Sequence, residues 1–117
     1  MLPEVTYPEV GVAAEPVGSC KGWDAWLDLR SGVRPTLHVK VRCTLPSPGY
    51  VVTLQPALPP GFNPRIYDLE RVVEPPEGPM PEVPTTVRVH YVEAIDNRYD
   101  EISVRSDGVR LPVRQEY

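Results

Sequence analysis

The chain has 117 residues, of which 41% are hydrophobic, and a formal net charge of −4; this length supports one domain with its own core. The negative charge argues against nonspecific nucleic-acid binding, which depends on neutralising phosphates with Lys and Arg. Sixteen prolines separate the apolar runs and would break helix interiors, so the composition also argues against a helical domain.

The sequence contains no apolar run approaching 18 residues, so no transmembrane segment is predicted. The first residues lack the basic region and the continuous apolar run of a signal peptide. The compartment stays open between the cytoplasm and the mature part of an exported protein.

Residues 1–19 are predicted to form an extended N-terminal arm, and residues 20–117 a single β-sandwich domain. Pro3, Pro8 and Pro16 interrupt the arm, which has no steady hydrophobic period. Residues 20–30 fit both a helical turn and a strand, so both alternatives stay open. We expect their two tryptophans, Trp23 and Trp26, to anchor this segment to the sandwich.

Apolar and polar residues alternate over residues 37–45, which predicts a strand. The Pro-Ser-Pro-Gly turn at residues 46–49 leads into a second strand at residues 50–54. The side chains of the first strand that we expect to face the core are Leu37, Val39, Val41, Cys43 and Leu45.

Further strands are predicted over residues 66–73, 85–94, 102–104 and 109–113. The connections at residues 55–65 and 74–84 are rich in proline and long for a small domain, and such loops are often functional. Short strands separated by turn signals predict an all-β, antiparallel β-sandwich of 6–7 strands with proline-rich loops. It resembles the immunoglobulin-like type in architecture, and this likeness implies no function.

Cys20 and Cys43 are the only cysteines. They could form a disulfide with a separation of 23 residues, worth roughly 3 kcal/mol, or they could remain reduced thiols. The two alternatives differ in consequence, because a disulfide would place the protein outside the reducing cytoplasm.

No residues are predicted to be catalytic, and no metal or other cofactor is predicted. The two histidines, His38 and His90, fall on the polar faces of their strands and do not show the spacing of a metal site. The polar corner at residues 96–101, Asp-Asn-Arg-Tyr-Asp-Glu, is interpreted as turn chemistry, because its order does not match a calcium-binding loop.

Basic residues recur at outward positions of the predicted strands, although the chain as a whole is acidic. If the strands are neighbours, these residues could form a face for an anionic partner. The alternatives are a solvated face paired with nearby acids, or a face covered by the acidic arm. The candidate residues are His38, Lys40, Arg42, Arg88, His90, Arg105, Arg110 and Arg114.

The leading hypothesis is a non-enzymatic binding module for an unidentified protein or ligand. A first alternative is a self-assembling structural protein, a homo-oligomer formed through the arm or the edge strand near residues 109–113. A second is a small hydrolase or metal-dependent enzyme that uses His38 or His90. A third is a proteinase inhibitor that presents a rigid proline-rich loop.

Overall fold

A computed structural model describes residues 17–30, 34–96 and 98–117. Most of the predicted arm and Asn97 of the polar corner lie outside the described residues. Within the described ranges the chain forms eight strands and one short 3-10 helix. The elements are β1 (Ser19–Asp28), β2 (Thr36–Leu45), β3 (Val51–Pro56), β4 (Ile66–Glu74), β5 (Thr85–Ala94), β6 (Glu101–Val104), η1 (Arg105–Asp107), β7 (Val109–Pro112) and β8 (Arg114–Glu116).

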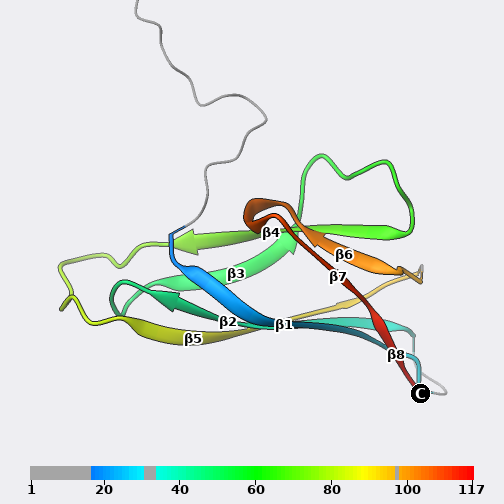
Figure 1. The fold of residues 1–117 in the computed structure, drawn as a ribbon, viewed down its shortest axis with the longest axis horizontal. Coiled ribbons are helices and arrows are strands. Elements are labelled where there is room, and N and C mark those ends of the chain that lie inside the picture. The colour runs from blue at the N-terminus through cyan, green and yellow to red at the C-terminus, as the bar shows by residue number, and fades with distance from the viewer. Residues whose placement is uncertain (1–16, 31–33, 97) are drawn as a thin grey trace, which may run out of the picture.

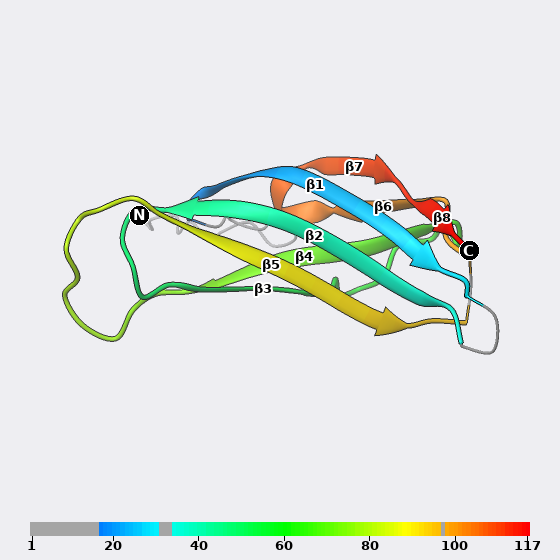
Figure 2. The same ribbon diagram turned by 90° about the horizontal axis from the view of Figure 1, so that it is seen from below.

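The strands form two sheets, with the orders β5-β2-β1-β8 and β3-β4-β6-β7 (Figure 1). Figure 2 shows β5, β2 and β1 side by side in the first of these. The predicted all-β class is therefore confirmed. Among the described residues, no helix is long and apolar enough to cross a membrane.

The antiparallel prediction needs correction, because β1 pairs with β8 and β4 pairs with β6 in parallel. The other pairings are antiparallel. Both parallel pairs arise where the chain changes sheet: β5 of the other sheet separates β4 from β6, and after β7 ends at Pro112 the chain enters the other sheet as β8. The predicted strand at residues 109–113 corresponds to β7, whereas β8 was not predicted, and the predicted number of 6–7 strands was too low.

The core is built on the inward face of β2, as the alternation predicted. All five expected residues are at most 2% exposed. They pack against buried residues of the other sheet, among them Leu69, Ile102 and Val104. Full burial of each aliphatic side chain contributes about 1.5–3 kcal/mol, so this row is the main apolar contribution of β2.

Residues 19–28 form a strand, with Ala25 and Leu27 buried in the core. The pairing with β2 shifts by one residue between Lys21 and Asp24, which is a β-bulge. The bulge reverses the in–out phase of the second half of β1, because side chains alternate along a strand. Trp23 therefore packs against the core, whereas Trp26 faces outward and stacks on His38. The two tryptophans thus contact the sandwich on opposite sides of its first sheet.

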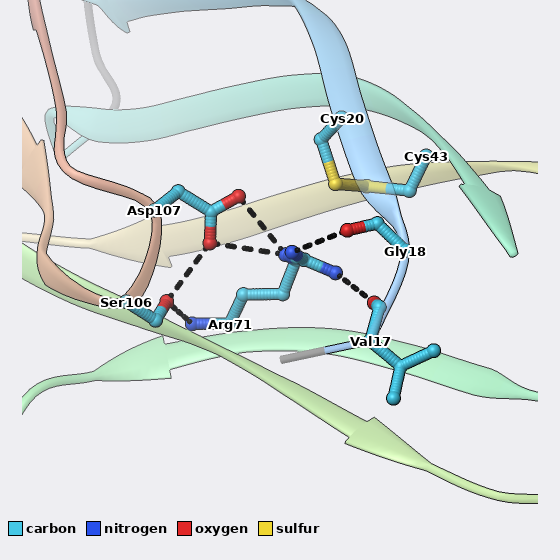
Figure 3. A network of polar contacts seen from close by, with 7 residues as sticks. All are labelled: Val17, Gly18, Cys20, Cys43, Arg71, Ser106 and Asp107. Carbon is cyan, nitrogen blue, oxygen red and sulfur yellow. Dashed lines mark hydrogen bonds and ion pairs between the residues drawn. A yellow bond between two sulfur atoms is a disulfide. The ribbon is translucent and has the colours of Figure 1, made fainter. Parts of the chain in front are cut away.

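Cys20 and Cys43 lie directly opposite each other in β1 and β2 and form a disulfide. The sequence left open whether the two cysteines form a disulfide or remain reduced thiols, and the structure contains the disulfide. Beside this disulfide a buried arginine, Arg71 of β4, makes contacts that tie three parts of the chain together (Figure 3). Its side chain is 3% exposed and forms an ion pair with Asp107 at 3.1 Å.

A second polar group between the sheets joins Tyr67 of β4 to Tyr91 and Glu93 of β5. Both phenol hydroxyls donate to the same carboxylate oxygen of Glu93. Burial, and then the hydrogen bond to Glu93, raises the pKa of Tyr67 to about 12. The same two causes raise the pKa of Tyr91. Both phenols therefore hold their protons more tightly than an exposed tyrosine does.

We expect this pair to make the protein sensitive to alkali. Tyrosines of the unfolded chain ionise near pH ~10, whereas Tyr67 of the folded chain keeps its proton until about pH 12. The stabilising contribution is therefore complete below about pH 10 and is lost as the pH rises toward 12. Urea unfolding measured between neutral and alkaline pH should show this decline. The Y67F/Y91F variant should decline less steeply than the parent, and a variant of the exposed Tyr117, Y117F, should follow the parent. Equal slopes for the parent and the double variant would refute the assignment.

Candidate anion-binding face

Six of the eight predicted basic-face residues lie on one sheet, β5-β2-β1-β8, because β2 and β5 are neighbours. These residues are His38, Lys40 and Arg42 of β2, Arg88 and His90 of β5, and Arg114 of β8. Of the remaining two, Arg105 begins η1 and forms an ion pair with Asp68, and Arg110 lies on β7 of the other sheet and forms an ion pair with Glu101. Alternation along a strand gives the side of a sheet but not which sheet the strand joins, so the sequence could not separate these two groups.

The basic residues stand in rows that cross the strands. Residues directly opposite each other in neighbouring strands point to the same face. Lys21 lies opposite Arg42, which lies opposite Arg88. Lys40 in turn lies opposite His90. These five residues, Lys21, Lys40, Arg42, Arg88 and His90, are called the basic face below.

Lys21 was not among the predicted residues, since it belongs to the segment whose helical or extended state was open. The outward direction of Trp26 was not predicted either. A bulge at Gly22 would have been the signal for Trp26, because a glycine inside a strand often marks such an irregularity. Gly22 adopts a φ of 75°, in the left-handed region.

A hollow of about 340 Å³ opens on the basic face at this bulge. Gly22 makes room for the Arg42 side chain, since a β-carbon there would come within 2.9 Å of a guanidinium nitrogen of Arg42. The Arg42 head group therefore lies against the β1 backbone. The residues that line the hollow are Gly22, Asp24, Lys40, Val41, Arg42, Arg88, Val89 and His90.

The hollow has an excess of positive charge. Its one acidic lining residue, Asp24, forms an ion pair with Arg114 at 3.2 Å. Within the described ranges, neither Arg42 nor Arg88 takes part in an ion pair. Like charges directly opposite each other on a sheet are destabilising. The Arg42–Arg88 pair is thus a local cost to folding that a bound anion would relieve.

An aromatic row runs along one side of the hollow and consists of Arg114, Trp26, His38 and His90. The rings of Trp26 and His38 stack at a centroid distance of 4.9 Å and an angle of 5°. Nδ1 of His38 lies 2.9 Å from Nε2 of His90, so one ring donates to the other. The Arg114 guanidinium lies 5.7 Å from the centroid of the Trp26 ring, within the range of a cation–π contact.

The aromatic row holds His90 at the edge of the hollow. Burial, and then the neighbouring charge of His90, lowers the pKa of His38. The lowered pKa favours the neutral form of His38, whose Nδ1 either donates to or accepts from Nε2 of His90. This contact fixes the His90 ring through a stack that extends to β8.

A second exposed feature is the loop at residues 57–65, where the side chains of Leu58 and Phe62 are 80% and 103% exposed. Asp68 of β4 holds this loop in shape. Its backbone oxygen accepts from the Ala57 amide, and its carboxylate accepts from the Gly61 amide, each at 3.0 Å. The loop therefore presents apolar side chains on a fixed backbone, but nothing in its surroundings indicates what would contact them.

His38 and His90, the two histidines considered for catalysis or metal binding, lie on adjacent strands and form a hydrogen bond with each other. However, no group of three or more His, Cys, Asp or Glu side chains in the described part of the chain could hold a metal ion. Both cysteines are in the disulfide, so neither presents a thiolate.

Comparisons with protein-family models, with curated proteins and with solved structures found no match. Function therefore has to be inferred from the geometry and charge of the site itself.

Proposed function

We propose that this chain is a non-enzymatic β-sandwich module that binds an anionic partner on the basic face. The single observation that carries the proposal is the direct opposition of Arg42 and Arg88 at the wall of a hollow, with no acidic partner for either among the described residues. Two guanidinium groups can hold a carboxylate, sulfate or phosphate through paired hydrogen bonds.

The chain concentrates positive charge on this face although its net charge is −4. Lys21 and Lys40 add to the two arginines, and Asp24, the acid that lines the same hollow, forms an ion pair with Arg114. Such a local field steers an anionic partner toward the face and is weakened by salt.

Two finer assignments belong to the same proposal. The two packed four-stranded sheets support an immunoglobulin-like relationship in architecture. The Cys20–Cys43 disulfide supports a place of action in an oxidising compartment.

The test is a comparison of two double variants that each remove two positive charges. R42Q/R88Q changes the basic face, and R65Q/R110Q changes exposed arginines elsewhere. The probes are inorganic sulfate, a heparin oligosaccharide and a glutamate-rich synthetic peptide, titrated calorimetrically at low and at physiological salt. We expect the parent to bind at least one probe, R42Q/R88Q to bind it at least ~10-fold more weakly, and R65Q/R110Q to stay within ~3-fold. Binding of none of the probes, or equal losses in both variants, would overturn the proposal.

A further inference from the structure

The strand β5 ends its sheet, and its outer edge is unusually regular. It pairs with β2 over ten consecutive residue pairs, from Thr85 to Ala94, without a register shift. No strand of the described part of the chain pairs with its other side. Sheet edges in soluble proteins are commonly protected by a proline, a bulge, a short strand or charged side chains. β5 is long and contains neither a proline nor a bulge, and its charged residues are Arg88 and the inward-facing Glu93. One row of its backbone donors and acceptors is therefore available for pairing.

The side chains along this edge alternate in character. Arg88 and His90 of the basic face point outward, two residues apart. Val87 and Tyr91 point inward and pack at the margin of the core. A strand added beside β5 would place its own alternate side chains opposite these residues, at about 4.5–5.5 Å between β-carbons. Acidic residues would suit the outward positions, and apolar residues the inward ones.

Charge argues against a second copy of β5 as the occupant. An antiparallel pair of β5 strands centred on Arg88 would bring the Arg88 side chains of the two copies directly opposite each other. Like charges directly opposite each other are destabilising, whereas opposite charges stabilise a cross-strand pair. An acidic strand therefore complements this edge better than the chain complements itself.

We propose that the anionic partner is an extended peptide segment with acidic residues at alternate positions, which adds to the sheet as a strand beside β5. This proposal rests on the proposed function and specifies its partner. The backbone of the segment pairs with the free edge of β5, and its carboxylates reach Arg88 and His90 at the rim of the hollow. Main-chain hydrogen bonds with β5 supply affinity for the segment, and the basic face makes binding selective for segments with acidic side chains.

The test uses three synthetic peptides with one sequence, in which glutamate and valine alternate. The first is unmodified, the second is N-methylated at every valine, and the third at every glutamate. N-methylation removes the amide donor and leaves the side-chain charges unchanged. Because the amides of a strand point alternately to its two sides, one of the two methylated peptides blocks pairing with β5 and the other does not.

We expect the unmodified peptide to bind the full chain, one methylated peptide to bind at least ~10-fold more weakly, and the other to stay within ~3-fold. Hydrogen exchange of the β5 amides should slow when the unmodified peptide binds. The R88Q variant should bind the unmodified peptide more weakly than the parent protein does, whereas the R65Q variant should bind it as tightly as the parent.

Other outcomes overturn the inference in distinguishable ways. If both methylated peptides bind as tightly as the unmodified peptide, strand addition is refuted, but the basic face remains a candidate anion-binding site. If sulfate or heparin binds but no peptide does, the partner class is wrong and the proposed function stands. If a stable dimer of the unliganded chain protects the β5 amides, self-association replaces the acidic partner. If nothing anionic binds, the proposed function fails as well.

Discussion

Replacing Arg71 by glutamine is expected to lower the free energy of unfolding by about 3–5 kcal/mol, because the substitution removes one partner of a buried ion pair. The side chains of Arg71 and Asp107 are 3% and 10% exposed, and Nε of Arg71 lies 3.1 Å from both carboxylate oxygens. Without the guanidinium, the Asp107 carboxylate stays buried without its counter-charge. Two backbone carbonyls also lose a donor, those of Val17 at 2.8 Å and Gly18 at 3.4 Å (Figure 3).

The matched control is R65Q. Arg65 forms an ion pair with Asp100 at 2.6 Å, which is shorter than the Arg71 pair, but the two side chains are 73% and 53% exposed. Exposed pairs contribute about 0–1 kcal/mol. Guanidinium chloride unfolding of both variants should therefore separate them by more than ~2 kcal/mol. A second variant, R71K, keeps the charge but not the forked donors, and should fall between R71Q and the parent. Similar losses for R71Q and R65Q would contradict the buried-clamp interpretation.

Arg71 illustrates which parts of the fold were readable from the sequence. The strand at residues 66–73 was predicted, and alternation along it puts Arg71 in the same row as Leu69 and Val73, but the burial of Arg71 was not predicted. The side chains and carbonyls that satisfy it come from residues 17–18 and from η1, more than thirty positions away on either side. No local pattern specifies such a convergence, because it depends on the order of strands in both sheets.

The candidate site shows the same division. The outward phase of β2 and β5 was predicted, and pairing of these two strands brings their basic residues together. The bulge at Gly22 was not predicted. It turns Trp26 outward and lies at the hollow. A single inserted residue reverses every later side chain of a strand, so the unrecognised bulge hid the outward direction of Trp26.

Removing the disulfide is the second large expected effect. The C20A/C43A variant should lose about 3 kcal/mol, the chain-entropy contribution of a crosslink that closes a loop of this size. The separation of the two cysteines is 23 residues, and they tie the start of β1 to the end of β2. Chemical unfolding of the variant, and of the parent with and without a reductant, measures this loss. An unchanged unfolding midpoint in the variant would contradict it.

The disulfide and Arg71 should not act independently. Cys20 follows within three residues of Val17 and Gly18, whose carbonyls Arg71 holds, so both devices fix the same end of β1 (Figure 3). In the C20A/C43A background this end can move, and the carbonyls and Asp107 can gain water when Arg71 is truncated. The cost of R71Q should therefore be smaller in C20A/C43A than in the disulfide-bonded parent, with a coupling of about 0.5–3 kcal/mol in a double-mutant cycle. R65Q, which is remote from the disulfide, should be additive in the same cycle. Additivity of R71Q would show that the covalent link and the arginine hold different parts of the sandwich.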